Sequence, residues 1–115
     1  MVLQEAVLSA LESGVKLIDT AQADEWYSED EVGRAVQRFF KRHGGGKDAP
    51  LDVVIVTKVH PRNYKRELLL AKVRESRRLL YGDLADRRPL DVVLLHSPYC
   101  WNGHCNAEVS YPTLP

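Results

Sequence analysis

The chain is organised around residues 51–61, LDVVIVTKVHP. Residues 53–56 form an unbroken run of β-branched side chains, which is typical of a parallel strand that is buried on both faces. Thr57 and Lys58 follow the run, and parallel sheets hold their ligand-binding groups at the carboxyl ends of their strands. Lys58 is therefore a candidate functional residue. A structural lysine whose stem packs at the strand end while its amine reaches water would give the same pattern.

The length and composition indicate one domain without a strong electrostatic partner. The chain has 115 residues, and its 16 Lys and Arg are balanced by 16 Asp and Glu. Because no net field draws it toward nucleic acid or an anionic membrane, we expect neither as a partner. Two cysteines are too few for a disulfide-stapled secreted scaffold, and no signal-like segment opens the chain, so we expect a cytoplasmic protein.

Other patterned segments predict an alternation of helices and strands. We expect helices at residues 2–13, from the Ser-x-x-Glu capping box at residues 28–31 to the glycines at 44–46, and at 64–81. Residues 15–21 and 90–95 predict two further strands. The resulting order, α-β-α-β-α-β, indicates an α/β fold with three parallel strands. Such a sheet has two unpaired edges, which suggests a segment of something larger.

A polar side chain stands at the end of each predicted strand. Asp19, Lys58 and His96 should meet at one rim of the sheet, and Tyr27 lies in the loop after the first strand. An ammonium beside a tyrosine stabilises the phenolate and so makes the phenol a better acid, while an imidazole can orient a carbonyl oxygen. The four residues therefore predict a proton-delivery site for carbonyl reduction. Taken singly, each could instead be a cap, a buried histidine or a packed ring.

Four motifs together resemble those of the aldo-keto reductases. They are VKLIDTA (15–21), Tyr27 followed by EVGRAV (31–36), VTKV (56–59) and LLHSP (94–98). The resemblance implies part of a (β/α)₈ TIM barrel that reduces aldehydes and ketones with NADPH. It implies Tyr27 as general acid, Lys58 and Asp19 as the groups that tune it, and His96 as the residue that orients the substrate carbonyl. Further implied contacts are Trp26 with the substrate, and Asp19 and Thr20 with the cofactor.

The resemblance runs from about Leu3 to Glu108. We expect residues 1–108 to form a partial barrel domain, followed by an irregular tail at 109–115. A complete barrel of this type has about 250 residues, so the chain matches only its first helix through its fourth strand. In the family, later loops bind the adenosine and phosphate end of the cofactor. We therefore expect a truncated form, an alternatively spliced product or an incomplete gene model, with impaired activity and weak NADPH affinity. The specific carbonyl substrate is not predicted.

Two other hypotheses remain open at this point. The chain could be a non-catalytic module that associates with itself or with a complete barrel through its open sheet edges. A zinc site at His96, Cys100, His104 and Cys105 is a weaker alternative, because the spacing lacks a paired Cys-x₂-Cys unit. The basic side chains of residues 65–88 alternate with acidic ones, and we interpret them as the solvated surface of a helix.

Overall fold

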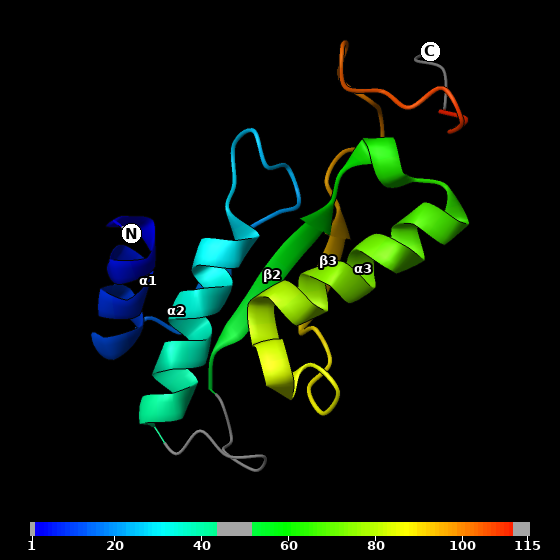
Figure 1. The fold of residues 1–115 in the computed structure, drawn as a ribbon. Coiled ribbons are helices and arrows are strands. Elements are labelled where there is room, and N and C mark those ends of the chain that lie inside the picture. The colour runs from blue at the N-terminus through cyan, green and yellow to red at the C-terminus, as the bar shows by residue number, and fades with distance from the viewer. Residues whose placement is uncertain (1, 44–51, 112–115) are drawn as a thin grey trace.

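The computed structural model describes residues 2–43 and 52–111 (Figure 1). The described chain forms one parallel sheet of three strands in the order β1-β2-β3, so β2 is central. This confirms the predicted α-β-α-β-α-β order. The elements are α1 (Val2–Glu12), β1 (Leu17–Asp19), α2 (Glu29–Arg42), β2 (Val54–Val59), α3 (Arg66–Tyr81) and β3 (Val92–Leu95), with 3₁₀ turns η1 (Pro61–Asn63) and η2 (Gly82–Leu84).

Helices α2 and α3 both pack on one face of the sheet. Ile55 of β2 is fully buried in a core that includes Val36 and Phe40 of α2 and Leu80 of α3. Helix α1 lies along α2 (Figure 1) and contributes Leu11 to the same core. Helices on a single face are the arrangement of a barrel wall, whose other face is turned toward the barrel axis.

The prediction that the central strand is buried on both faces is wrong. Burial alternates along β2, and Val54 is 41% exposed. On the neighbouring strands, Leu17 is 60% exposed and Leu94 is 45% exposed. Strand pairing places these three side chains on the face opposite the helices. In a closed barrel this face is filled by side chains from the other strands. No element in residues 2–43 and 52–111 covers it, so we call it the open face.

The sequence predicted the end of α1 correctly, but it did not predict how α2 begins. Gly14, just after α1, has φ +98°, the left-handed conformation that suits a glycine after a helix. Ser28 precedes α2, but its hydroxyl donates to Asp30 Oδ1 (2.7 Å) and makes no hydrogen bond to the helix backbone. The predicted capping box is therefore wrong, because the serine hydroxyl is turned toward the Asp30 carboxylate and its oxygen accepts no hydrogen bond from a helix N–H. The predicted end of α2 at the glycines of 44–46 lies outside the described residues.

Residues after β3 form no helix or strand up to residue 111, yet they pack against the rest of the chain. Val109 is buried, and the Tyr111 hydroxyl donates to the carbonyl of Pro61 (2.9 Å). These contacts dock the segment at the carboxyl end of β2. The boundary between a domain at 1–108 and a tail at 109–115 stays a prediction, and residues 112–115 lie outside the described part.

Candidate active site

The carboxyl ends of β1 and β2 are joined by backbone hydrogen bonds and by one side chain. The N–H of Thr20 donates to the carbonyl of Val56 (2.8 Å), and the N–H of Gln22 donates to the carbonyl of Lys58 (3.1 Å). Lys58 Nζ donates to Asp19 Oδ1 (2.8 Å) and to the carbonyl of Thr20 (3.0 Å). Strand pairing therefore holds the ammonium group beside the carboxylate.

Tyr27 and His96 lie next to this ion pair. Lys58 Nζ is 5.3 Å from the centroid of the Tyr27 ring, and the ring centroids of Tyr27 and His96 are 5.7 Å apart. The backbone N–H of His96 donates to the carbonyl of Val59 (3.1 Å), so the pairing of β2 with β3 also sets this histidine. The structure thus brings the four predicted residues, Asp19 included, into one cluster. Their catalytic roles stay predictions.

The charge state of His96 suits hydrogen bonding. Burial lowers the pKa of its imidazole, and the Lys58 ammonium lowers that pKa further, against the opposing effect of Asp19. An imidazole with a pKa below about 6.5 is mainly neutral at pH 7 and carries one N–H donor. Its Nδ1 is buried without a hydrogen-bond partner among the described residues. The ring can therefore donate to a carbonyl oxygen without adding a second cation beside Lys58.

The two residues predicted to contact the cofactor differ in what they expose. The side chain of Asp19 is exposed, and its Oδ1 is bonded to Lys58. Thr20 is only 2% exposed. Its backbone N–H donates to the carbonyl of Val56, and its carbonyl accepts from Lys58 Nζ. Asp19 can therefore accept a hydrogen bond from a ribose hydroxyl, whereas the Thr20 side chain faces the interior.

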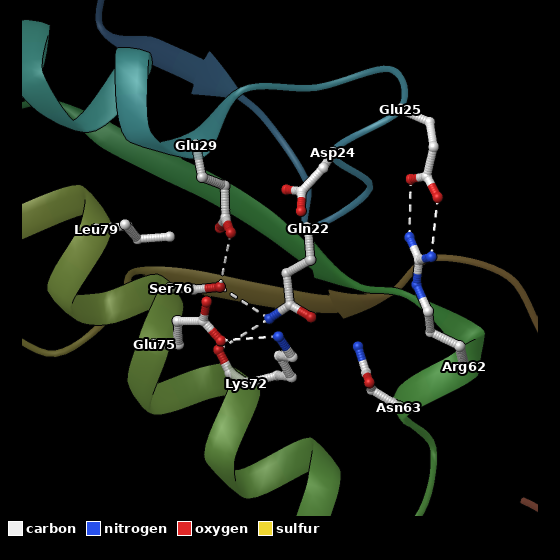
Figure 2. Close-up of a pocket in the computed structure, with 10 residues that line it drawn as sticks. All are labelled: Gln22, Asp24, Glu25, Glu29, Arg62, Asn63, Lys72, Glu75, Ser76 and Leu79. Carbon is white, nitrogen blue, oxygen red and sulfur yellow. Dashed lines mark hydrogen bonds and ion pairs between the residues drawn. The ribbon is translucent and has the colours of Figure 1, made fainter. Parts of the chain in front are cut away.

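A second polar cluster lies on the helix side of the sheet (Figure 2). Glu29, at the start of α2, accepts hydrogen bonds from Thr57 Oγ1 (2.6 Å) and Ser76 Oγ (3.0 Å). Gln22 Nε2 donates to Ser76 Oγ (2.8 Å) at the edge of a polar cavity of about 350 Å³. Burial raises the pKa of the Glu29 carboxyl group. This anchor was not predicted, because the sequence pattern assigned Glu29 only to the predicted capping box.

Aromatic side chains surround a shallow cavity of about 430 Å³ beside the four-residue cluster. Trp26, predicted to contact substrate, stands at its edge and is largely exposed. Trp101 also lines it, with its ring centroid 6.2 Å from that of Trp26 and 5.1 Å from that of His96. We call this space the aromatic cavity; its lining residues are Trp26, Tyr27, His96, Trp101, Asn102 and His104. Of these residues, Trp26, Tyr27 and His96 were predicted to belong to the carbonyl site, and Trp101 was not assigned a role.

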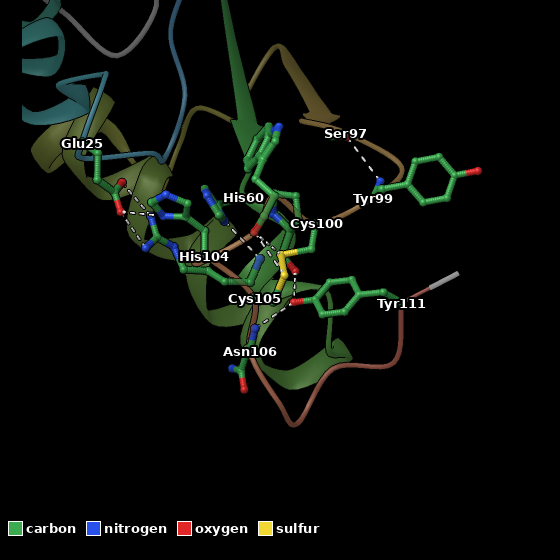
Figure 3. Close-up of a disulfide and its surroundings, with 12 residues drawn as sticks. Glu25, His60, Ser97, Tyr99, Cys100, His104, Cys105, Asn106 and Tyr111 are labelled. Atoms are coloured by element: carbon green, nitrogen blue, oxygen red, sulfur yellow. Dashed lines mark hydrogen bonds and ion pairs between the residues drawn. A yellow bond between two sulfur atoms is a disulfide. The ribbon is translucent and has the colours of Figure 1, made fainter. Parts of the chain in front are cut away.

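Cys100 and Cys105 are joined in a disulfide (Figure 3). The cysteine count did not predict this bond. Both sulfur atoms are bonded to each other and cannot act as thiolate ligands, so the hypothesis of a zinc site with His96 and His104 is wrong for this structure. Within residues 2–43 and 52–111, no group of three or more His, Cys, Asp or Glu side chains is placed to hold a metal ion. In the same part of the chain, no helix is both long enough and apolar enough to cross a membrane.

Comparisons with known proteins agree with this geometry. The Aldo/keto reductase family matches residues 2–108. A structure provisionally assigned as a 2,5-diketo-D-gluconic acid reductase B is 32% identical, with a TM-score of 0.65, over 84% of this chain and 30% of that chain. Aldose reductase from Giardia lamblia is 26% identical, with a TM-score of 0.67, over 98% of this chain and 37% of that chain.

A third structure, Bombyx mori aldo-keto reductase in complex with NADP, shares the fold at 22% identity, with a TM-score of 0.66, over 96% of this chain and 32% of that chain. No curated protein sequence matches at a significant level. The chain spans about a third of the length of the solved structures that it matches. With the family match over residues 2–108 and the barrel-wall fold, the chain belongs to the aldo/keto reductase family.

Proposed function

We propose that this chain carries the proton-donating part of an NADPH-dependent reductase of aldehydes and ketones. The observation that supports it is the single cluster at the strand ends, in which Lys58 contacts Asp19 (2.8 Å) and lies 5.3 Å from the Tyr27 ring, and in which His96 packs against Tyr27. NADPH, when bound, supplies the hydride that reduces the carbonyl carbon. Among the residues described, Asp19 fits the cofactor best, because its exposed carboxylate can accept from a ribose hydroxyl.

In this proposal Tyr27 is the general acid. Its phenolic O–H donates a proton to the carbonyl oxygen as that oxygen gains negative charge, and water returns a proton to the phenolate afterwards. The Lys58 ammonium stabilises the phenolate, and Asp19 keeps this ammonium in place through their hydrogen bond. The neutral His96 imidazole donates a hydrogen bond that orients the carbonyl oxygen. The exposed ring of Trp26 forms one side of the substrate site.

Turnover with an aromatic aldehyde tests this assignment. The wild-type chain, at high protein and NADPH concentration, should oxidise NADPH slowly, since only Asp19 and Thr20 are assigned to the cofactor. Tyr27→Phe should lower the rate by about 10²-fold or more, which is typical of losing a general acid. Tyr99→Phe is the matched control and should retain the wild-type rate, because the one hydrogen bond that Tyr99 makes to the described residues runs from its backbone N–H to Ser97 Oγ (3.3 Å) and does not involve its phenol. Equal rates for Tyr27→Phe and wild type would remove Tyr27 from the mechanism.

The expected weak cofactor affinity has its own test. Isothermal titration of the isolated chain with NADPH should give no binding in the micromolar range. Micromolar binding would mean that this chain holds the cofactor by itself, without the later loops of the family.

The cytoplasmic location expected from the sequence is part of this proposal, and cell fractionation tests it.

The open face favours a second candidate function, self-association. Leu17, Val54 and Leu94 leave an apolar surface in water, and β1 and β3 each have an unpaired edge in the described sheet. A second copy of this chain would cover both features. Sedimentation should then show a dimer that dissociates on dilution, and Val54→Glu should yield a monomer. A wild-type chain that stays monomeric and unfolds cooperatively at every concentration would contradict self-association.

A further inference from the structure

The disulfide closes a small loop that carries half of the aromatic cavity. Residues 101–104 lie between the bonded cysteines, Cys100 and Cys105 (Figure 3). Three of these residues, Trp101, Asn102 and His104, line the cavity. Gly103, with φ +82°, allows the tight turn in which the N–H of His104 donates to the carbonyl of Trp101 (3.1 Å). The loop is thus folded on itself around the S–S bond.

Trp101 is the central ring of this cluster. Its centroid lies 4.9 Å from that of His60, 5.1 Å from that of His96 and 6.2 Å from that of Trp26. The ring therefore stands between the end of β2, the end of β3 and the loop after β1. Any molecule in the aromatic cavity beside His96 would contact it.

The disulfide fixes the shape of the loop itself, and the packing of Trp101 against His60, His96 and Trp26 is its main contact with the rest of the chain. In the part of the chain that the structure describes, residues 100–104 make no hydrogen bond to a helix or strand. His104 Nδ1 lies 3.7 Å from Glu25 Oε1, a partly exposed pair that is shared with Arg62. A partly exposed pair at this distance holds the loop only weakly. Cys105 is exposed and Cys100 is half-buried, so a small thiol can reach the bond.

We propose that Trp101 is a specificity-determining wall of the carbonyl site, held in place by the Cys100–Cys105 disulfide and released when that bond is reduced. The identification of the cavity as the carbonyl site rests on the proposed function. The ligands that gain most from this wall are flat aromatic carbonyl compounds, because the adjacent rings of Trp101 and Trp26 both line the cavity and can stack with or pack edge-on against an aromatic ring.

The chemical step is a two-electron thiol–disulfide exchange with a dithiol reductant. One thiolate of the dithiol attacks one cysteine sulfur, forms a mixed disulfide with it and releases the other cysteine as a thiolate. The second thiolate of the dithiol then attacks the dithiol sulfur of the mixed disulfide and releases the second cysteine. The S–S bond of Cys100 and Cys105 breaks, each sulfur ends as a thiol, and the dithiol is oxidised to its own disulfide. The open loop regains the conformational freedom that the cross-link removed, so Trp101 spends less time against His96.

Intrinsic fluorescence can test this directly, because Trp26 and Trp101 are the two tryptophans of the chain and both line the cavity. In a Trp26→Phe variant, Trp101 is the only tryptophan. Acrylamide quenching of its emission should increase about twofold or more when the protein is reduced with dithiothreitol, since local opening exposes the ring. The double variant Cys100→Ser/Cys105→Ser, in the same Trp26→Phe background, should show the high quenching with and without dithiothreitol.

Binding of 4-nitrobenzaldehyde, followed by quenching of the same emission, gives the second readout. Its dissociation constant should rise about tenfold on reduction, the size expected when one aromatic contact is lost. Circular dichroism establishes that each variant and redox state is folded. Unchanged acrylamide quenching after reduction, with two thiols titrated, overturns the proposal, and so does finding two free thiols before any reductant is added.

The outcomes separate this inference from the proposed function. If quenching of Trp101 increases on reduction but the aldehyde binds in neither state, the disulfide holds the ring and the assignment of the cavity to a carbonyl substrate fails. If the aldehyde binds equally in both states while quenching increases, Trp101 is not a specificity determinant, and that part of the proposal fails.

Discussion

The two faces of the sheet differ in what they contain, although the same strands form both. On the helix side, Ile55, Thr57 and Val59 are buried, and Ile55 packs in the core with residues of α2 and α3. On the open face, Val54 is exposed, and Lys58 reaches Asp19. Alternation along β2 thus assigns one set of residues to the core and the intervening set to the candidate site. Residues that are neighbours in the sequence therefore have different roles: those on the helix side stabilise the fold, and those on the open face form the candidate site.

The contrast is sharpest between Thr57 and Lys58. The Thr57 hydroxyl donates to the buried Glu29 carboxylate on the helix side, while the next residue extends its ammonium toward Tyr27 on the other. Glu29 lies two residues after Tyr27 in the chain, so its anchoring to Thr57 also fixes where the loop with Tyr27 returns to the sheet. The core face in this way supports the geometry of the open face without taking part in its chemistry.

The largest effect that can break this comparison is a cavity on the helix side. Ile55→Ala should lower the free energy of unfolding by about 2–5 kcal/mol, because it removes buried methylene and methyl groups from the core. Val54→Ala, its neighbour on the open face, should cost less than about 1 kcal/mol. Urea denaturation of both variants measures the difference. Similar losses for the two would mean that the open face is covered in solution, as a second copy of the chain would cover it.

A smaller, pH-dependent effect is expected from His60, at the end of β2. Burial, with a smaller effect from Arg62, lowers the pKa of this fully buried imidazole to about 4, against the opposing Glu25. The unfolded chain, with a pKa of about 6.5, then binds the proton first as the pH falls. The stability due to the neutral His60 is therefore present above pH 6.5 and is lost as the pH falls toward 4, by up to about 3 kcal/mol.

His60→Asn isolates this effect. An asparagine oxygen can replace His60 Nδ1 as acceptor of the Arg62 N–H (3.0 Å), but it does not titrate. Unfolding free energies measured from pH 7 to pH 4 should fall more steeply for the wild type than for the variant. Glu29, whose pKa is raised, has the opposite dependence in both proteins and cancels in the difference. Parallel profiles would show that His60 is not the titrating group.

The sequence predicted the parts of the molecule that follow from local rules. Asp19, Lys58 and His96 were found because parallel strands bring their carboxyl ends to one rim, and Tyr27 because its loop begins there. The single-sided burial of residues 53–56 was not predictable, since every side chain in that run is apolar and β-branched whichever face it takes. The face that lacks a covering layer is a property of tertiary structure.

Other features depended on contacts far apart in the sequence. Glu29 could not be assigned its role, because its partners Thr57 and Ser76 lie 28 and 47 residues away. The disulfide was missed because the number of cysteines carries no information on whether a turn at Gly103 brings two of them together. Trp101 became part of the site only through that turn.

The smallest expected effect concerns the start of α2, where the capping signal and the structure disagree. Ser28→Ala should change the free energy of unfolding by less than about 0.5 kcal/mol, because the serine hydroxyl bonds to Asp30 and not to the helix backbone. A serine that caps a helix loses about 1 kcal/mol in the same substitution. Urea denaturation distinguishes the two values. A loss near 1 kcal/mol would show that Ser28 caps α2 in solution, and the helix start would then be fixed from its own sequence as well as by the Glu29 contact with β2.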